Sequence, residues 1–203
     1  MNSTAPVSFP ETESSPRRDA VLQAALAEMV ERGFHGTTMP EVAKKAGVGI
    51  GTIYRYFADK DALGNALYRQ CKEALGAALW SEFPPLPDLR RQFDELWRRM
   101  SRFAQEQPLV LAFCELHHHA SYLDAHSRAV EEKMMTPAIA LLAQGQRDGV
   151  LRALPAELMA AMVWAMLVAL CTQAPRPFDP DIVAAAGDSA WAAIANPAGG
   201  ELG

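Results

Sequence analysis

One stretch of twenty residues, 38–57, restricts the possible fold of this chain more than any other segment; it reads TMPEVAKKAGVGIGTIYRYF. Thr38 followed three residues later by Glu41 forms a capping box, and Pro40 lies in the first turn, where a proline costs no backbone hydrogen bond. A helix therefore begins here. Gly47 can adopt the left-handed conformation that ends a helix, so this helix is short and a second one is expected from residue 49 or 50 to 57.

The two short helices have the spacing of a helix-turn-helix. Ala43 is small enough to let them cross closely, and Ile53 and Phe57, four residues apart, share the inward face of the second helix. This geometry places a second helix in the major groove of DNA. For an isolated Ala-x-x-x-Gly motif, an ordinary helical hairpin is the alternative. The residues expected to face outward are Ile50, Gly51, Thr52 and Arg55.

The segment TIYRYFADKDAL, residues 52–63, resembles the TetR family of bacterial transcriptional regulators. The recognition helix of that family ends in a similar T-[LI]-Y-x-[YH]-F and continues into a D/S-K-x-x-L helix start. The resemblance implies that Tyr54, Tyr56 and Lys60 contact DNA phosphates. A phenol or an ammonium group can bind a phosphate oxygen and fix register without reading sequence. The alternative is that the tyrosines are half-buried core residues and Lys60 is a solvated charge.

The recognition helix departs from the family pattern at its start, where Gly49 and Ile50 replace the more usual polar pair. An isoleucine cannot bond a phosphate or a guanine, but it suits the methyl group of a thymine. The operator sequence is therefore not transferable from relatives.

Two further cations, Arg17 and Arg18, lie in the first turn of a preceding helix, where positive charge opposes the helix dipole. The resemblance suggests phosphate or minor-groove contact, and a solvated arginine pair is the alternative. The net charge of −5 does not argue against DNA binding, because local field rather than net charge attracts phosphate. The predicted DNA-binding residues are Arg17, Arg18, Thr38, Lys44, Ile50, Gly51, Thr52, Tyr54, Arg55, Tyr56 and Lys60.

Composition indicates a globular protein, with 50% hydrophobic and 21% charged residues in a chain of 203. The polar N-terminus has no apolar leader, and the longest nearly unbroken apolar run, residues 158–171, is too short for a membrane span. Three scattered cysteines fit free thiols in a reducing compartment. We therefore expect a cytoplasmic protein without a membrane partner.

Apolar residues recur at helical spacing along the chain and never alternate as in a strand, which predicts an all-α fold of about nine helices. We expect a disordered tail over residues 1–15, a helix-turn-helix DNA-binding domain over 16–63, and a helical ligand-binding and dimerisation domain over 64–203. A long helix from Asp59 to about Trp80 joins the two domains. Later helices are expected over residues 88–107, 109–122, 127–147 with a kink at Pro137, 157–172 and 181–194.

The C-terminal part is rich in Met and aromatic residues, which can adapt to and line a pocket for an apolar or aromatic inducer. Such residues at helical spacing are also typical of an ordinary core. The predicted ligand-binding residues are Trp97, Met100, Phe103, Phe113, Cys114, His117, His118, Met134, Met162 and Met166.

Cys114 and His118, four residues apart on one helix face, allow a metal-sensing alternative, but two ligands do not complete a zinc site. The element Glu115-x-x-His118 also occurs in di-iron helical bundles, which need a second copy that this chain lacks. No nucleophile or nucleotide motif appears. We therefore predict no enzyme, no cofactor and no metal, with a helical-bundle metalloenzyme as the remotest alternative.

The last two predicted helices suggest an interface between two copies. Residues 157–172 are apolar almost all round, which indicates burial on more than one side, and residues 181–194 are rich in alanine. The TetR resemblance implies that these helices form half of a four-helix dimer interface; an ordinary core pair is the alternative. The predicted interface residues are Trp164, Val168, Ile182 and Trp191. The predicted function is that of a homodimeric repressor, released from a palindromic operator by a small molecule.

Overall fold

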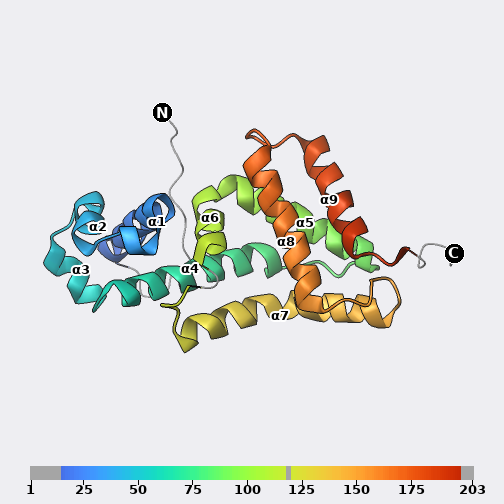
Figure 1. The fold of residues 1–203 in the computed structure, drawn as a ribbon, viewed down its shortest axis with the longest axis horizontal. Helices are drawn as coiled ribbons and strands as arrows, with labels where there is room; N and C mark the ends of the chain where they lie inside the picture. Colours follow the sequence, from blue (N-terminus) through green and yellow to red (C-terminus); the bar gives the residue numbers. More distant parts are fainter. Residues whose placement is uncertain (1–14, 118–119, 198–203) are drawn as a thin grey trace. The chain divides into compact units, whose positions relative to one another are not determined.

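A computed structural model of the protein describes residues 15–117 and 120–197. Within these ranges the regular structure is helical, apart from one isolated antiparallel bridge between Leu151 and Ala195. The helices described there (Figure 1) are α1 (Pro16–Gly36), α2 (Met39–Ala46), α3 (Ile50–Tyr56), α4 (Lys60–Trp80), α5 (Leu89–Glu106), α6 (Pro108–His117), α7 (Ala125–Arg147), α8 (Ala156–Gln173) and α9 (Pro180–Ile194). The all-α prediction is confirmed.

The helices form two compact units that are not continuous in sequence. The first unit comprises the residues up to Leu75 together with Gln107–Met134, and the second comprises Gly76–Glu106 together with the residues from Met135 onward. Helices α4 and α7 therefore contribute to both units. The predicted domains, by contrast, divide the chain once, between residues 63 and 64.

Acidic and hydroxyl side chains start several of the helices. Asp59 accepts a hydrogen bond from the amide of Ala62 at 2.7 Å, and Asp88 accepts one from the amide of Arg91 at 2.8 Å. Both residues were expected to open helices, because a carboxylate there satisfies free backbone N–H groups. The predicted tail lies outside the described residues except for Ser15, which is the N-cap of α1.

The end of α6 corrects the sequence analysis, which extended this helix to residue 122. Helix α6 ends at His117, and residues 121 and 122 form a turn. Tertiary contacts hold this turn: the Tyr122 ring stacks on Phe34 at 3.9 Å between centroids, and the Tyr122 carbonyl accepts a hydrogen bond from Asn65 at 2.8 Å. Pro137 lies inside α7, as expected.

Each unit has its own apolar core. In the first unit, Leu26 and Met29 of α1 and Leu67 of α4 are fully buried. In the second unit, Trp97 and Phe93 of α5 are buried. Burying each such side chain stabilises the fold by about 1.5–3 kcal/mol. Figure 1 shows α8 and α9 side by side and antiparallel within the second unit, in agreement with their direct contact.

Candidate DNA-binding surface and C-terminal sites

The turn between α2 and α3 has the predicted geometry. Thr38 and Glu41 form the reciprocal capping box, and the Thr38 hydroxyl, which donates to Glu41 Oε2 at 2.7 Å, lowers the pKa of that carboxyl. Gly47 has φ 65°, a left-handed conformation that costs glycine little. The amide of Val48 donates to the Ala43 carbonyl at 3.0 Å, which closes the end of α2.

The orientation of α3 is fixed by the side chains that it buries. Ile53 is fully buried and Phe57, which follows the helix, is 4% exposed. The opposite face carries Ile50, 41% exposed, and Tyr54, 52% exposed. The outward direction predicted for Ile50 is therefore confirmed.

Ion pairs hold α2 against α1. The buried carboxylate of Glu28 accepts from Lys45 at 2.9 Å and lies 3.4 Å from Arg32, which also binds Glu41 at 2.7 Å. Lys45 is therefore occupied within the fold. Its neighbour Lys44 is exposed and pairs with no acidic group in the part of the chain that the structure describes. Of these two lysines, Lys44 is the one available to a phosphate.

Tyr56 has a second role besides the predicted phosphate contact. Its hydroxyl lies 2.8 Å from Ser15 Oγ and accepts from Arg55 at 3.0 Å, and the Ser15 contact foremost lowers the pKa of Tyr56. The Arg18 guanidinium lies 5.6 Å from the centroid of the Phe57 ring. The end of α3 thus holds the start of α1, which places Arg18 beside the recognition helix.

Lys60 is also engaged within the fold. Its ammonium group donates to the carbonyl oxygens of Phe34 and Thr37, at 2.9 and 3.1 Å, and lies 4.6 Å from the centroid of the Phe34 ring. These carbonyls belong to the end of α1, where a cation is electrostatically favourable. Two of the three ammonium protons are used in this way, so one remains for a phosphate.

Lys60→Ala is expected to lower the free energy of unfolding by about 2 kcal/mol, because hydrogen bonds from a charged group are lost. If Lys60 also contacts a phosphate, the variant binds all DNA sequences more weakly and its salt slope is flatter by about 1. Chemical denaturation measures the first effect, and salt titration of DNA binding measures the second. Lys44→Ala, at an exposed position, is the control for stability. If Lys60→Ala had the same free energy of unfolding as the wild type, the hydrogen bonds from Lys60 to the two carbonyls would make no net contribution to stability.

The last residue of α6, His117, is a buried polar group next to α1. His117 is 4% exposed, its ring stacks on Phe113 with 4.3 Å between centroids, and its Nδ1 lies 3.0 Å from the Tyr122 hydroxyl. Burial lowers the pKa of His117 from its ordinary value. Gly64 of α4 is required here, because a Cβ atom would lie 2.9 Å from the Tyr122 ring.

The free energy of unfolding should therefore fall as the pH is lowered from 7 to 5.5. The unfolded chain binds a proton at His117 near pH 6.5, whereas the buried imidazole resists protonation, so acid favours unfolding by up to about 1.4 kcal/mol per pH unit. Chemical denaturation at several pH values measures this slope. His117→Gln should flatten it, and His35→Gln, at an exposed histidine, should not. Equal slopes in the wild type and His117→Gln would contradict the assignment.

The residues predicted to line one ligand pocket are divided between the two units. Phe113, Cys114 and His117 are buried in the first unit. Met134 is a half-buried residue of the same unit, and His118 lies outside the described residues. In the second unit, the buried or half-buried residues of the predicted set are Trp97, Met100, Phe103, Met162 and Met166. Trp97 lines a groove between α5 and α9, and Met166 lines a smaller apolar groove between α8 and α9.

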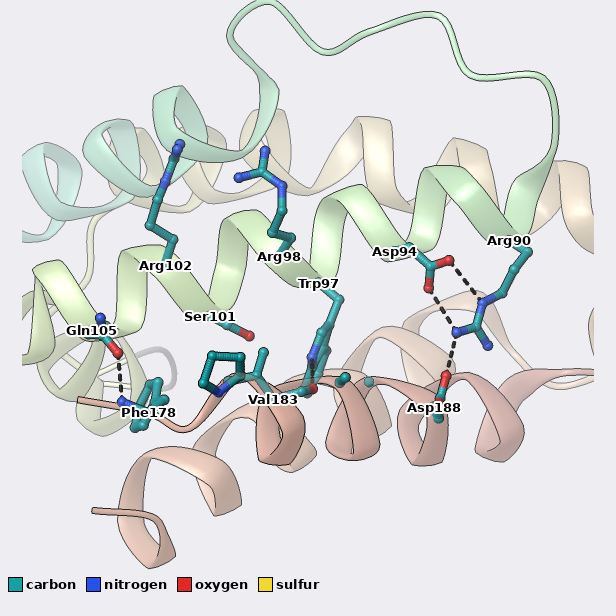
Figure 2. Close-up of a pocket in the computed structure, with 13 residues that line it drawn as sticks. Arg90, Asp94, Trp97, Arg98, Ser101, Arg102, Gln105, Phe178, Val183 and Asp188 are labelled. Atoms are coloured by element: carbon teal, nitrogen blue, oxygen red, sulfur yellow. Dashed lines mark hydrogen bonds and ion pairs between the residues drawn. The ribbon is translucent and has the colours of Figure 1, made fainter. Parts of the chain in front are cut away.

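The larger groove has a volume of about 550 Å³ and lies wholly within the second unit (Figure 2). Within it, the indole N–H of Trp97 donates to the Val183 carbonyl at 2.8 Å. At the Phe178 end, the backbone amide of Phe178 donates to Gln105 at 2.8 Å. Ser101 lies between these two contacts. A cavity of this size is in the range of small-molecule sites.

The metal-sensing alternative receives no geometric support from Cys114. Its thiol is fully buried, and burial raises its pKa to about 11, so the thiolate that binds a metal is disfavoured. No group of three or more His, Cys, Asp or Glu side chains with metal-binding geometry occurs in residues 15–117 and 120–197. His118, the predicted partner of Cys114, is not among these residues.

Helix α8 exposes much of its apolar surface. It buries a single stripe in the unit, formed by Met159, Val163, Leu167 and Leu170, while Ala165 and Leu158 are exposed. By length and composition α8 could also cross a membrane, although it was expected to be too short; 17% of its residues are buried. An apolar helix face of this extent indicates a further partner surface.

The predicted interface residues differ in their surroundings. Ile182 is 44% exposed, and Trp164 and Val168 are half-buried. Trp191 packs within the unit instead: its ring lies 5.3 Å from that of Phe93, between centroids. Trp191 thus joins α9 to α5, a role that the sequence analysis did not predict for it.

Comparison with known families accounts for both parts of the chain. A family model described as "Bacterial regulatory proteins, tetR family" matches residues 21–67, and one described as "Tetracyclin repressor-like, C-terminal domain" matches residues 68–196. The chain belongs to the TetR family. The resemblance noted in the recognition helix is therefore confirmed over most of the sequence.

Individual TetR relatives match to different extents. An uncharacterised HTH-type transcriptional regulator of Haemophilus influenzae is 31% identical over 41% of this chain and 45% of its own length. UidR of Escherichia coli is 36% identical over 31% of this chain and 32% of its own length. These curated relatives are thus matched over less than half of their length. RutR of Escherichia coli O157:H7 is 29% identical over 85% of this chain and 80% of its own.

Solved TetR-family structures cover most of the fold. A TetR family transcription regulator from Marinobacter aquaeolei VT8 has a TM-score of 0.77 and 25% identity, over 89% of this chain and 96% of that one. A regulator of the same family from Shewanella sp. PV-4 has a TM-score of 0.75 and 26% identity, over 89% of this chain and 99% of that one.

Sequence reasoning missed two features of this TetR-family chain. The bond between Ser15 and Tyr56 joins residues 41 positions apart, and no local pattern marks it. The α5–α9 groove was also missed, although Arg98 and Arg102, four residues apart, mark one face of α5. The two arginines alone did not indicate a groove, because its α9 wall lies about eighty residues later in the chain.

Proposed function

We propose that this protein is a cytoplasmic, homodimeric transcriptional repressor that binds a palindromic operator and is released from it by a small molecule. The observation that carries the DNA-binding role is the outward face of α3. Ile53 anchors the helix in the core, and Ile50, Tyr54 and Arg55 are presented to solvent on its other side. A helix held in this way can enter the major groove.

The proposed residue roles follow from these contacts. Ile50 reads a base edge, since its methyl groups can contact a thymine. Tyr54, Lys44 and the remaining ammonium proton of Lys60 bind phosphates and fix the register. Arg18 lies beside the recognition helix, where it can reach the adjoining backbone or minor groove. Tyr56 combines a phosphate contact with the hydrogen bond that holds Ser15.

The dimer is supported by the apolar face of α8. Exposed alanines such as Ala161 and Ala165 allow close approach of a second helix, and Ile182 of α9 extends the same kind of surface. Burial against a second copy removes this area from water, at about 25 cal/mol per Å² of apolar surface. A two-fold dimer presents two reading heads, which is why the operator is expected to be a palindrome.

Release by a small molecule requires differential affinity. A ligand that binds more tightly to the conformation with wrongly spaced reading heads weakens operator binding by the same coupling free energy. Ligand binding in the second compact unit therefore acts on DNA binding through the conformational equilibrium of the dimer.

Selection of DNA fragments from a pool of random duplexes tests the proposal. The full chain is expected to enrich a palindrome with two half-sites about one helical turn apart, centre to centre. Gel-shift titration of the enriched duplex should show one dimer per site. Enrichment of no sequence, or of a single half-site bound by a monomer, would contradict the proposed function.

A further inference from the structure

The groove between α5 and α9 runs past Trp97, with Arg90 and Asp188 on one side of the ring and Ser101 and Phe178 on the other. Trp97 bridges the two helices: it lies so close to α9 that a Cβ atom at Gly187 would be 2.7 Å from its ring. On the Ser101 side, the backbone amide of Phe178 is bound to Gln105. The apolar walls between Trp97 and Phe178, which include Val183 and Ala184, suit a flat hydrocarbon body.

A buried polar atom faces this space without a partner. Ser101 is 4% exposed, and its Oγ makes no hydrogen bond to any group in the described parts of the chain. Figure 2 shows its side chain on the side of α5 that faces α9, between the Gln105 and Trp97 contacts. An unsatisfied buried hydroxyl costs about 1–3 kcal/mol, so such an atom in a groove indicates a missing hydrogen-bond partner.

The charges divide the groove into two halves. Beyond Trp97, Arg90 pairs with both Asp94, at 2.9 Å, and Asp188, so that half carries its own counter-ions. On the Ser101 side, Arg98 binds Glu95, whose pKa it lowers to about 2, whereas Arg102 pairs with no carboxylate among the described residues. Arg102 is exposed, and in Figure 2 its side chain points away from α9, so it must turn back over α5 to reach a ligand in the groove.

We propose that this groove binds a small organic acid with a flat apolar body. The body lies between Trp97 and Phe178, one carboxylate oxygen accepts from the Ser101 hydroxyl, and the Arg102 guanidinium folds over the rim to bind the other. The positive charge of Arg102 attracts the carboxylate, and the hydrogen bond from Ser101 orients it. This proposal names the chemical class of the inducer and therefore rests on the proposed function. It replaces the purely apolar or aromatic ligand that the sequence suggested.

Binding of 2-naphthoate to the full chain tests the groove without DNA. The uncharged 2-naphthamide, which has the same shape, is the matched probe. The indole N–H resonance of Trp97, assigned by its loss in Trp97→Phe, should shift on titration with naphthoate, with a dissociation constant of about 1 mM. Naphthamide should bind about tenfold more weakly, because a charge-assisted hydrogen bond is absent.

Variants locate the site and its charge. Arg102→Gln should reduce naphthoate affinity about tenfold, to that of naphthamide, and Ser101→Ala should weaken both probes. Arg91→Gln, at an exposed arginine on α5 outside the groove, should change nothing. Ala184→Trp should abolish binding, since it fills the groove from an exposed position. Failure of naphthoate to bind, or equal binding by Arg102→Gln or Ala184→Trp, would overturn the proposal.

The two proposals fail in different ways. Operator binding is measured on the unliganded protein. If the protein bound no operator, the regulator function would be contradicted, and the naphthoate titration followed at Trp97 would still test the groove. If both binding experiments succeed, naphthoate should release the operator from the wild type and not from Ala184→Trp. Release that is equal in both proteins would show that the inducer acts elsewhere.

Discussion

Ala165→Glu is expected to convert the dimer into monomers and to abolish operator binding at concentrations where the wild type is saturated. Ala165 is exposed in the protomer, in the middle of the apolar face of α8, so the carboxylate does not disturb the core of a single chain. In the dimer it would be buried without a counter-ion, at a cost of several kcal/mol. A cost of about 4 kcal/mol raises the dimer dissociation constant about a thousandfold.

Sedimentation at several protein concentrations measures the dissociation constant, and helical circular dichroism confirms that the variant is folded. Ala140→Glu is the matched control, because it makes the same change at an exposed alanine on α7. This control should remain dimeric. A folded Ala165→Glu dimer would place the interface elsewhere, and would leave the exposed face of α8 to another partner.

Ile50→Lys is expected to increase affinity for random DNA about tenfold at 0.1 M salt, because a new cation at the groove releases one more counter-ion. The salt slope should become steeper by about 1, and discrimination between operator and random DNA should fall. Most substitutions in a binding surface weaken binding, so an increase in affinity for random DNA would be specific evidence that residue 50 faces the DNA. Ile50 is 41% exposed at the start of α3, and a lysine can extend there without burial.

Thymine-to-uracil replacement in the selected operator complements this variant. Loss of the one methyl group that contacts Ile50 should cost about 1 kcal/mol in the wild type and nothing in Ile50→Ala. Replacement of thymines elsewhere in the same duplex is the control. If no thymine methyl affects wild-type binding and Ile50→Lys leaves the salt slope unchanged, Ile50 does not lie in the groove.

The helix-turn-helix was predictable from sequence because its determinants are local. The capping box joins Thr38 and Glu41, three positions apart. The left-handed Gly47 ends α2 by its own conformational freedom, and Ile53 and Phe57 are one turn apart. Each of these signals acts within a few residues, so their order along the chain is also their order in space. The all-α class followed from periodicity in the same way.

Tertiary structure alone decided which polar groups are free. Lys60 looked like a simple phosphate ligand until the carbonyls of Phe34 and Thr37, 26 and 23 residues away, were seen to hold it. Tyr122, which helical spacing placed in the same helix as Cys114, instead lies in a turn and stacks on Phe34, 88 positions earlier in the chain. In a chain of 203 residues, a side chain such as that of Lys60 has many possible hydrogen-bond partners 20 or more positions away. Only the folded structure shows which of them it binds.

The sequence by itself determined the DNA-reading unit, the helical class and the apolar face of α8, since all three depend on spacing along one helix or two adjacent ones. Only the tertiary structure showed the α5–α9 groove, because two of the contacts along it join residues 86 and 73 positions apart, Trp97 with Val183 and Gln105 with Phe178. A groove between two helices depends on how the helices pack together and not on the sequence of either helix alone.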